Sequence, residues 1–151
     1  PPRSTLFPYT TLFRSLLVFG SVVDDMKEQL VSMCDADERI QYIGWLQADD
    51  TYPYFAASDL AVFPGRHSVM WEQVAGQGIP MICKYWDGTT HVDIGGNVQF
   101  LYQDSTEEIQ KKLEELMTKG EEYQKMRKVA LEKGKKIFSY REIAKKAIGL
   151  K

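Results

Sequence analysis

Hydrophobic residues occur along the chain in short runs that alternate with longer amphipathic segments. Five of these runs are rich in Val, Ile, Phe and Tyr and have the composition of β-strands. They are LLVFG at 16–20, IQYIGW at 40–45, DLAVFPG at 59–65, IPMICKY at 79–85 and VQFLY at 98–102. Because most of them are nearly continuous rather than alternating, we expect strands that are covered on both faces.

Helical patterns fill the intervals between these predicted strands. We expect helices over residues 24–33, 51–58 and 69–77, and a helical tail from Thr106 to the end of the chain. Strands that alternate with helices in this way predict an α/β fold with a doubly wound parallel sheet.

Polar pairs mark the expected starts of two helices in the tail. Ser105 with Glu108, and Ser139 with Glu142, have the spacing of capping boxes. Gly120 is expected to end the first of these helices. The lysine-rich stretch KGKKIF lies between them and is interpreted as a solvated helix face, with a patch for anionic lipids as the alternative.

Composition and charge exclude several classes of protein. The chain has 151 residues, is 44% hydrophobic and carries 19 basic against 21 acidic residues, which fits one soluble α/β domain and gives no broad attraction for nucleic acid. Its apolar runs are far shorter than the ~20 residues that span a bilayer. Two cysteines, Cys34 and Cys83, indicate no disulfide framework and no metal cluster, which suits a reducing cytoplasm. We expect Cys83 to lie in the core.

The loop between the third and fourth predicted strands carries the candidate chemistry. In parallel α/β sheets, ligands bind at loops that follow the carboxyl ends of strands. Within FPGRHSVMWEQVAGQGIP, Pro64 and Gly65 turn the chain, Ser68 is the expected N-cap of the helix, and Gly78 is its expected stop.

The start of that predicted helix favours an anion, and its first turn carries a carboxylate. Free backbone N–H groups near Ser68, Val69 and Met70 would favour a phosphate. Glu72 lies one turn in, where a carboxylate suits two adjacent hydroxyls such as those of a ribose. The alternative is that Glu72 is an ordinary surface residue.

Several segments resemble one family, in order and at similar spacing, over a match that runs from Leu16 to nearly the end. They include FAASDLAVFPG at 55–65, WEQVAGQGIPMI at 71–82 and FSYREIA at 138–144. These segments resemble the C-terminal, donor-binding half of retaining glycosyltransferases with the GT-B fold. More narrowly, they are similar to the group-1 (family 4-like) enzymes that build bacterial surface polysaccharides.

This resemblance implies a fold and an activity. The fold would be a Rossmann-like GT-B C-terminal domain, truncated at its N-terminus. The intact enzyme would be hexosyltransferase-like, would take a nucleotide-diphosphate sugar as donor, and would need no cofactor and no metal. Transfer would be aided by stabilising charge on the departing diphosphate. It would act in the cytoplasm, with peripheral association at the inner face of the membrane as a further option.

The resemblance also implies that part of the enzyme is missing from the sequence. A glycan or lipid-linked acceptor would bind an N-terminal domain, together with basic residues that clamp the diphosphate, so no catalytic residue is assigned and the fragment is expected to be inactive alone. Two alternatives stay open: a nucleotide-sugar epimerase of the same architecture, and a non-catalytic nucleotide-binding module.

Donor-binding positions carry over residue by residue. Glu72 matches the family's second loop glutamate, which holds the ribose hydroxyls, and residues 66–69 match the turn that receives the diphosphate and sugar. Gly44 and Trp45 fall where the base is held, where Trp45 would stack on it or else serve as a packing residue. The full expected donor-binding set is Gly44, Trp45, Gly65, Arg66, His67, Ser68, Val69, Glu72 and Lys84.

One departure from the family pattern affects this site. The family has two glutamates separated by seven residues, but Pro64 stands eight positions before Glu72. The expected substitutes are His67, which can bond a sugar hydroxyl or phosphate oxygen, and Arg66, which can pair with phosphate. Lys84, Asp87 and His91 follow the next strand on the expected ligand rim. The alternative for WDGTTH is a plain turn with Gly88 at its bend.

Residues 1–15 do not share the character of the rest of the chain. PPRSTLFPYTTLFRS shows neither a helical period nor strand alternation, and all fifteen residues can be read back into one frame of a common short-read sequencing adapter. We therefore expect residues 1–15 to be an adapter-derived artefact with no native fold, and residues 16–151 to be a partial nucleotide-sugar-binding domain.

Overall fold

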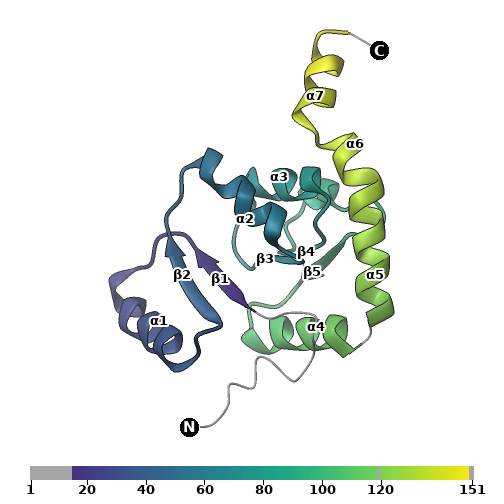
Figure 1. The fold of residues 1–151 in the computed structure, drawn as a ribbon. Coiled ribbons are helices and arrows are strands. Elements are labelled where there is room, and N and C mark those ends of the chain that lie inside the picture. The colour runs from purple at the N-terminus through teal and green to yellow at the C-terminus, as the bar shows by residue number, and fades with distance from the viewer. Residues whose placement is uncertain (1–14, 119, 150–151) are drawn as a thin grey trace. The chain divides into compact units, whose positions relative to one another are not determined.

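A computed structural model describes residues 15–118 and 120–149 of the chain (Figure 1). The adapter interpretation concerns a segment that, except for Ser15, lies outside the described residues. Contacts within the chain define two units, the first ending at Pro53 and the second beginning at Tyr54. The strands are β1 (Leu16–Phe19), β2 (Ile40–Gly44), β3 (Ala61–Phe63), β4 (Met81–Lys84) and β5 (Val98–Leu101). The main helices are α1 (Asp24–Ala36), α2 (Tyr52–Ala57), α3 (Met70–Gln77), α4 (Thr106–Thr118), α5 (Gly120–Val129), α6 (Lys135–Ile137) and α7 (Tyr140–Ala147).

Short helical turns complete the described elements. They are the 3₁₀ helices η1 (Ala48–Thr51) and η2 (Thr90–Val92) and the π-helical turn η3 (Ala130–Gly134). All five predicted strands and all predicted helical regions are present, and every strand pair is parallel. The α/β class predicted from the alternating pattern is therefore confirmed.

The first unit pairs β1 with β2 and packs α1 against β2. Leu16 and Phe19 are both more than one-third exposed, and α1 has no buried residue. The prediction that these strands are covered on both faces is wrong within this unit, because α1 is the one long helix that it contains among the described residues. The described strands form two sheets rather than one.

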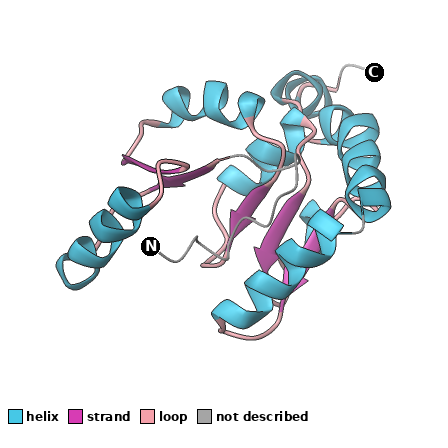
Figure 2. Ribbon diagram, turned by 60° about the horizontal axis from the view of Figure 1, so that its bottom comes forward, coloured by secondary structure: helices cyan, strands magenta, loops and turns pink. Residues whose placement is uncertain are grey.

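The second unit is built on a three-stranded sheet in the order β3-β4-β5. All four residues of the central strand β4 are buried, as expected for a strand covered on both faces. Met81 and Cys83 pack with Trp71, Val74 and other core residues on the α3 side. Helix α4 packs against β5, and Figures 1 and 2 show α3 and α4 on opposite sides of the sheet.

The glycine that follows α3 is confirmed as the residue that ends the helix. Close packing explains why two other positions are glycine. Gly78 has φ +79°, and its N–H donates to the carbonyls at the end of α3. A Cβ at Gly134 would lie 2.0 Å from the carbonyl oxygen of Ala75, and one at Gly76 would lie 2.8 Å from that of Phe138. Helix α3 is therefore in backbone contact with the helical segment that ends the chain.

The caps of the tail differ partly from expectation. The Ser105 hydroxyl accepts the N–H of Glu108, but the Glu108 carboxylate accepts the N–H groups of Tyr102 and Gln103 instead of closing the box. Ser139 is the N-cap of α7 without a side-chain bond, and the Glu142 carboxylate accepts a hydrogen bond from Lys145 instead of closing the box.

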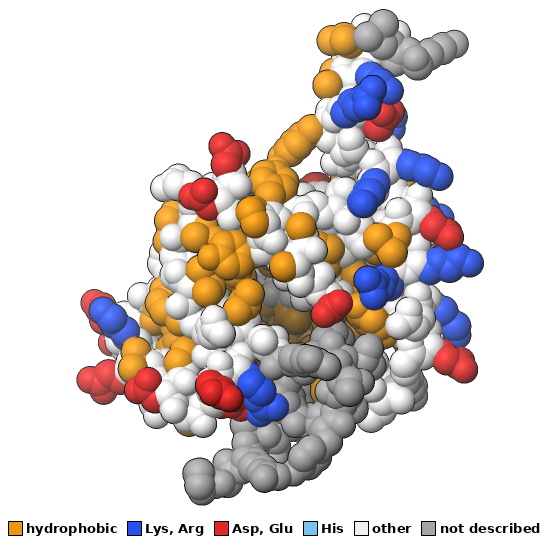
Figure 3. All heavy atoms as spheres, in the orientation of Figure 1, with side chains coloured by type: hydrophobic (Ala, Val, Ile, Leu, Met, Phe, Trp, Pro, Cys, Tyr) orange, Lys and Arg blue, Asp and Glu red, His pale blue; other side chains and the backbone are white. Residues whose placement is uncertain are grey.

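Gly120 begins α5 rather than simply ending α4, with Glu121 and Glu122 in the first turn of the new helix. Acidic residues stabilise the positive end of a helix dipole, which explains a start at this glycine. Lys135 and Lys136 further along are exposed, and Figure 3 shows basic side chains of this region interleaved with acidic ones, as expected for a solvated helix face.

Candidate functional site

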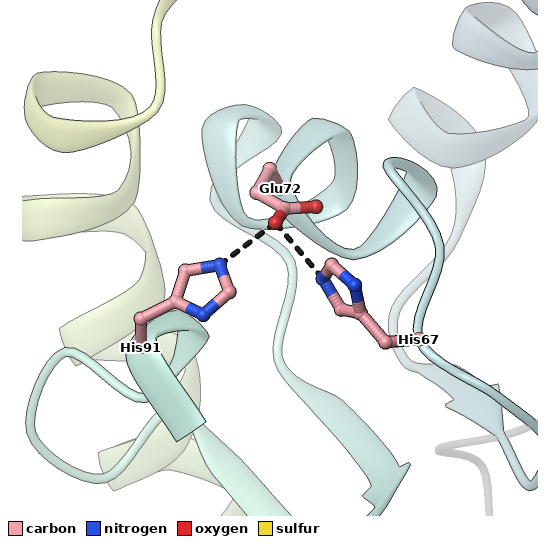
Figure 4. A group of neighbouring side chains, drawn as sticks. All are labelled: His67, Glu72 and His91. Atoms are coloured by element: carbon pink, nitrogen blue, oxygen red, sulfur yellow. Dashed lines mark hydrogen bonds and ion pairs between the residues drawn. The ribbon is translucent and has the colours of Figure 1, made fainter. Parts of the chain in front are cut away.

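Both histidines of the chain lie against one carboxylate (Figure 4). Nε2 of His67 lies 2.9 Å from Oε1 of Glu72, and Nε2 of His91 lies 2.7 Å from the same oxygen. An ionised carboxylate can only accept hydrogen bonds, so each ring donates its Nε2–H to this atom. Oε2 of Glu72 is buried and has no hydrogen-bond partner among the described residues.

The three side chains come from loops and a helix at the carboxyl edge of the sheet. His67 follows β3, Glu72 is in the first turn of α3, and His91 belongs to η2, which follows β4. Strands β3 and β4 are adjacent and parallel, so the segments that leave their carboxyl ends meet at one edge. The arrangement is the one expected for a ligand site in a parallel α/β sheet.

Glu72 and His67 are held by Trp71, whose side chain is fully buried in the core. The His67 ring meets the Trp71 ring edge-on, with centroids 4.9 Å apart. The loop between β3 and α3 is fastened further by Trp86, whose Nε1–H donates to the Gly65 carbonyl at 3.3 Å. Glu72 therefore extends from a helix whose neighbouring residue is anchored in the core.

His91 is held by the buried ends of its loop. Val92 is fully buried beside it, and so is Asn97. The Asn97 amide donates to the Val92 carbonyl at 3.0 Å and accepts the N–H of Ile94 at 2.8 Å. A buried amide with both ends bonded fixes the loop, because leaving either group unpaired would cost free energy. The His91 ring also lies edge-on to Phe138, with centroids 6.4 Å apart.

Electrostatics keep Glu72 charged. Burial alone would raise the pKa of this carboxyl, but hydrogen bonds from His91, from its own backbone N–H and from His67 lower it below its ordinary value. Nearby, burial raises the pKa of the Cys83 thiol, and the charge of Glu72 adds to that shift. The site therefore presents a carboxylate, and Cys83 is a core residue as predicted.

The predicted cap at Ser68 is wrong. Val69 is the N-cap of α3, with helical φ and ψ of −57° and −16°, and no side chain caps the helix. The valine side chain has no hydrogen-bond acceptor, so this cap residue cannot bond the first N–H groups of the helix. The first N–H of this turn with a backbone partner among the described residues is that of Trp71, which donates to the Ser68 carbonyl at 3.0 Å. The amides of Ser68, Val69 and Met70 precede it.

The remaining predicted residues lie in different surroundings. Gly65 and Arg66 are exposed in the turn after β3, and Asp87 is exposed in a turn where Gly88 has φ +77°. The Lys84 ammonium is bonded to Asp104 after β5. Donor binding by Lys84 stays a prediction, and would require that ion pair to open.

Gly44 and Trp45, the residues predicted to hold the base, belong to the first unit. Gly44 ends β2 with φ +84°, and its carbonyl accepts the N–H of Gly20 at 3.0 Å. The Trp45 side chain is 68% exposed, which leaves its ring open to stacking. Their role stays a prediction.

A pocket of about 380 Å³ lies elsewhere in the second unit. Its lining includes Asp59 and Pro80, which precede β3 and β4, and Gln77 and Arg127. These positions are at the amino ends of the strands, opposite the edge that carries Glu72. Because ligands of parallel α/β sheets bind at the carboxyl ends, we favour the Glu72 edge as the candidate site.

The convergence of both histidines on Glu72 was not predicted from sequence. His91 was expected only on a rim near the ligand. The sequence did contain a hint of this contact, because each histidine follows the end of a predicted strand and those two strands, β3 and β4, were expected to be neighbours. The spacing alone does not give the distance between their side chains.

No protein-family model matches the chain, and no curated protein matches it. Among solved structures, the chain is similar to Alr3699/HepE of Anabaena, whose crystal structure is of a complex with UDP. The similarity covers 90% of this chain and 41% of that chain, with a TM-score of 0.63 and 14% sequence identity. The chain thus spans less than half of that protein's length. This likeness shows the fold: a Rossmann-like α/β domain of the GT-B C-terminal kind, with a helical tail.

Every helix in the described parts of the chain is too short or too polar to cross a lipid bilayer.

Proposed function

We propose that the chain is the donor-binding part of a glycosyltransferase and that it binds a nucleoside diphosphate sugar at the carboxyl edge of the β3-β4-β5 sheet. The observation that carries this proposal is Glu72, a charged and partly buried carboxylate in the first turn of α3. The fold and the complex of Alr3699/HepE with UDP support a nucleoside diphosphate as the ligand class.

In this proposal Glu72 accepts hydrogen bonds from the two ribose hydroxyls. Its Oε1 already accepts two bonds, whereas the partnerless Oε2 has unused acceptor capacity. A buried acceptor without a partner is costly, so a ligand hydroxyl that reached it after a small side-chain rotation would be favoured.

The diphosphate would lie over the turn before α3. Its oxygens would meet the amides of Ser68 to Met70 and the guanidinium of Arg66, which is exposed beside them. His67 and His91 would take over contacts to the donor sugar in place of the first family glutamate. Lys84 is assigned a weaker role, at the phosphates, because it is bonded to Asp104.

Sugar transfer would belong to the whole enzyme. The acceptor, a glycan or lipid-linked sugar of surface-polysaccharide synthesis, would bind outside this chain. The site described above would stabilise negative charge on the departing diphosphate, which is where electrostatic catalysis would act.

A nucleotide screen tests the proposal. UDP, GDP and ADP are added in turn to the untagged chain in EDTA, and the unfolding midpoint and the heat of binding are measured. We expect at least one of them to raise the midpoint and to shift the ring signals of both histidines in NMR spectra. If no nucleoside diphosphate binds a chain shown to be folded, the proposal is wrong.

A further inference from the structure

We propose that His67, Glu72 and His91 form a binding site for a divalent transition-metal ion, with zinc as the best fit. The ligand atoms would be the two Nε2 atoms and Oε1 of Glu72. This inference does not rest on the proposed function, because it concerns the metal alone.

The donor set suits zinc. Two imidazole nitrogens and one carboxylate oxygen form one of the ligand sets that hold Zn²⁺ while a fourth position stays open. Imidazole also accepts Cu²⁺, Ni²⁺ and Fe²⁺, whereas Mg²⁺ and Ca²⁺ prefer oxygen ligands. A site with two nitrogens and one oxygen therefore discriminates against the two most abundant divalent ions.

The geometry brings the three ligand atoms near the spacing of a metal site, and the side chains would complete it by rotating. The three ligand atoms lie within 4.8 Å of one another, and each nitrogen already lies 2.7 or 2.9 Å from the carboxylate oxygen. Zinc bonds of about 2.0–2.2 Å at tetrahedral angles place ligand atoms about 3.3 Å apart. Each nitrogen would thus move away from Oε1 by roughly half an ångström, and the two nitrogens, which lie within 4.8 Å of each other, would move together by as much as about 1.5 Å. The rings are partly exposed, with 31% and 47% of their side chains accessible, so they have room to do so.

The protons can be accounted for. In the metal-free site each Nε2 carries the hydrogen that it donates to Glu72, whereas a metal needs the lone pair of that nitrogen. On binding, a neutral ring would transfer its proton from Nε2 to Nδ1 by exchange with water. A charged ring would release one proton to solvent, so the affinity for metal falls as the pH falls.

The surroundings hold the ligands in place. Trp71 packs on His67 and is next to Glu72, while the buried Val92 and the Asn97 bonds fix the backbone on either side of His91. Each ligand thus comes from a separate, anchored element. Support of this kind lowers the cost of bringing ligands together. The ion would face solvent at its open position, where water or an anionic ligand can bind.

The test uses the metals themselves. The untagged full-length chain is freed of metal with EDTA, transferred to buffer without chelator and titrated with Zn²⁺ by calorimetry and with Co²⁺ by visible absorption. We expect one ion per chain and the absorption of tetrahedral cobalt, with no comparable binding of Mg²⁺ or Ca²⁺. His67→Ala and His91→Ala should each weaken zinc binding by at least about tenfold.

Controls separate this site from other zinc ligands. Cys34 is a partly exposed thiol that can bind zinc by itself, and Cys34→Ser should leave the affinity unchanged. The chain has two histidines, so NMR of the unmutated protein can follow both rings even if a variant fails to fold. Both should shift together on adding Zn²⁺.

Either of two results would overturn the site. One is a folded chain that binds no zinc, and the other is binding that survives His91→Ala but is lost in Cys34→Ser. Zinc binding without nucleotide binding would instead refute the proposed function and leave this site standing.

Discussion

His91 and Glu72 are nineteen residues apart in sequence, yet His91 Nε2 lies 2.7 Å from Glu72 Oε1. This contact joins the loop after β4 to the helix after β3, and so ties together the two crossovers at the carboxyl edge of the sheet. It also means that a ligand of Glu72 meets an imidazole that is already in place.

Glu72→Gln should weaken binding of the nucleoside diphosphate that the screen identifies. The amide keeps the shape of the side chain but loses its charge, and hydrogen bonds to a charged group contribute about 1.5–3 kcal/mol. We therefore expect a roughly tenfold to hundredfold rise in Kd, measured by calorimetry in EDTA. Glu107→Gln is the matched control, since Glu107 is exposed in the first turn of α4. Equal affinities of both variants would contradict the ribose role of Glu72.

Gly134→Ala should destabilise the second unit. The new Cβ would lie 2.0 Å from the Ala75 carbonyl oxygen, which the backbone of α3 can relieve only by moving. We expect a loss of about 1–3 kcal/mol in the free energy of unfolding, from urea denaturation. Gly120→Ala meets nothing within 4 Å and serves as control, with no loss or a small gain. A neutral Gly134→Ala variant would show that α3 and η3 do not pack this closely.

The two thiols should differ in reactivity. Burial raises the pKa of Cys83, so little thiolate forms there at pH 8, whereas Cys34 is partly exposed. In the folded chain one thiol should react quickly with a disulfide reagent, and in denaturant both should react. The folded Cys34→Ser variant should show no fast reaction. Rapid reaction of both thiols would mean that the core around β4 is not formed.

Arg39→Ala should lower the stability of the first unit near neutral pH and make that stability depend less on pH in acid. Hydrogen bonds from the Arg39 side chain lower the pKa of Asp37 from 3.8 to about 2. Folding thus favours the charged form of Asp37. Its contribution to the free energy of unfolding is fully present above pH 3.8 and is lost as the pH falls through about 2. In Arg39→Ala the pKa of Asp37, followed by NMR, should return toward 3.8. Arg141→Ala, at an exposed position of α7, should leave it near 2.

The central part of the fold was predictable because local and long-range preferences agree there. The run IPMICKY is apolar almost throughout, which favours a strand and also demands cover on both faces, and β4 is buried at every position. The same reasoning, that loops after parallel strands meet at one edge, predicted that the loops after β3 and β4 would lie together, as they do.

The predicted helix ends were wrong at residues whose type is compatible with more than one local structure. Glycine has a low helix propensity, so Gly120 was expected to end a helix, but the acidic pair that follows it favours the start of a new one. Ser68 is a common N-cap residue, but Val69 occupies the cap position, one residue later, and already has helical angles. The meeting of the histidines could not be predicted either, because it depends on how Asn97 folds its loop back through contacts that the local sequence does not specify.

The contacts at Gly76 and Gly134 have a consequence for how the chain can be shortened. Helix α3 is wedged between the sheet and the last helices, with no room for even a methyl group at these two contacts. The C-terminal helices are therefore the back wall of the Glu72 site rather than an appendage. A truncation before η3 would remove that wall and leave Glu72 on a helix free to tilt, even though His67, Glu72 and His91 would all still be present.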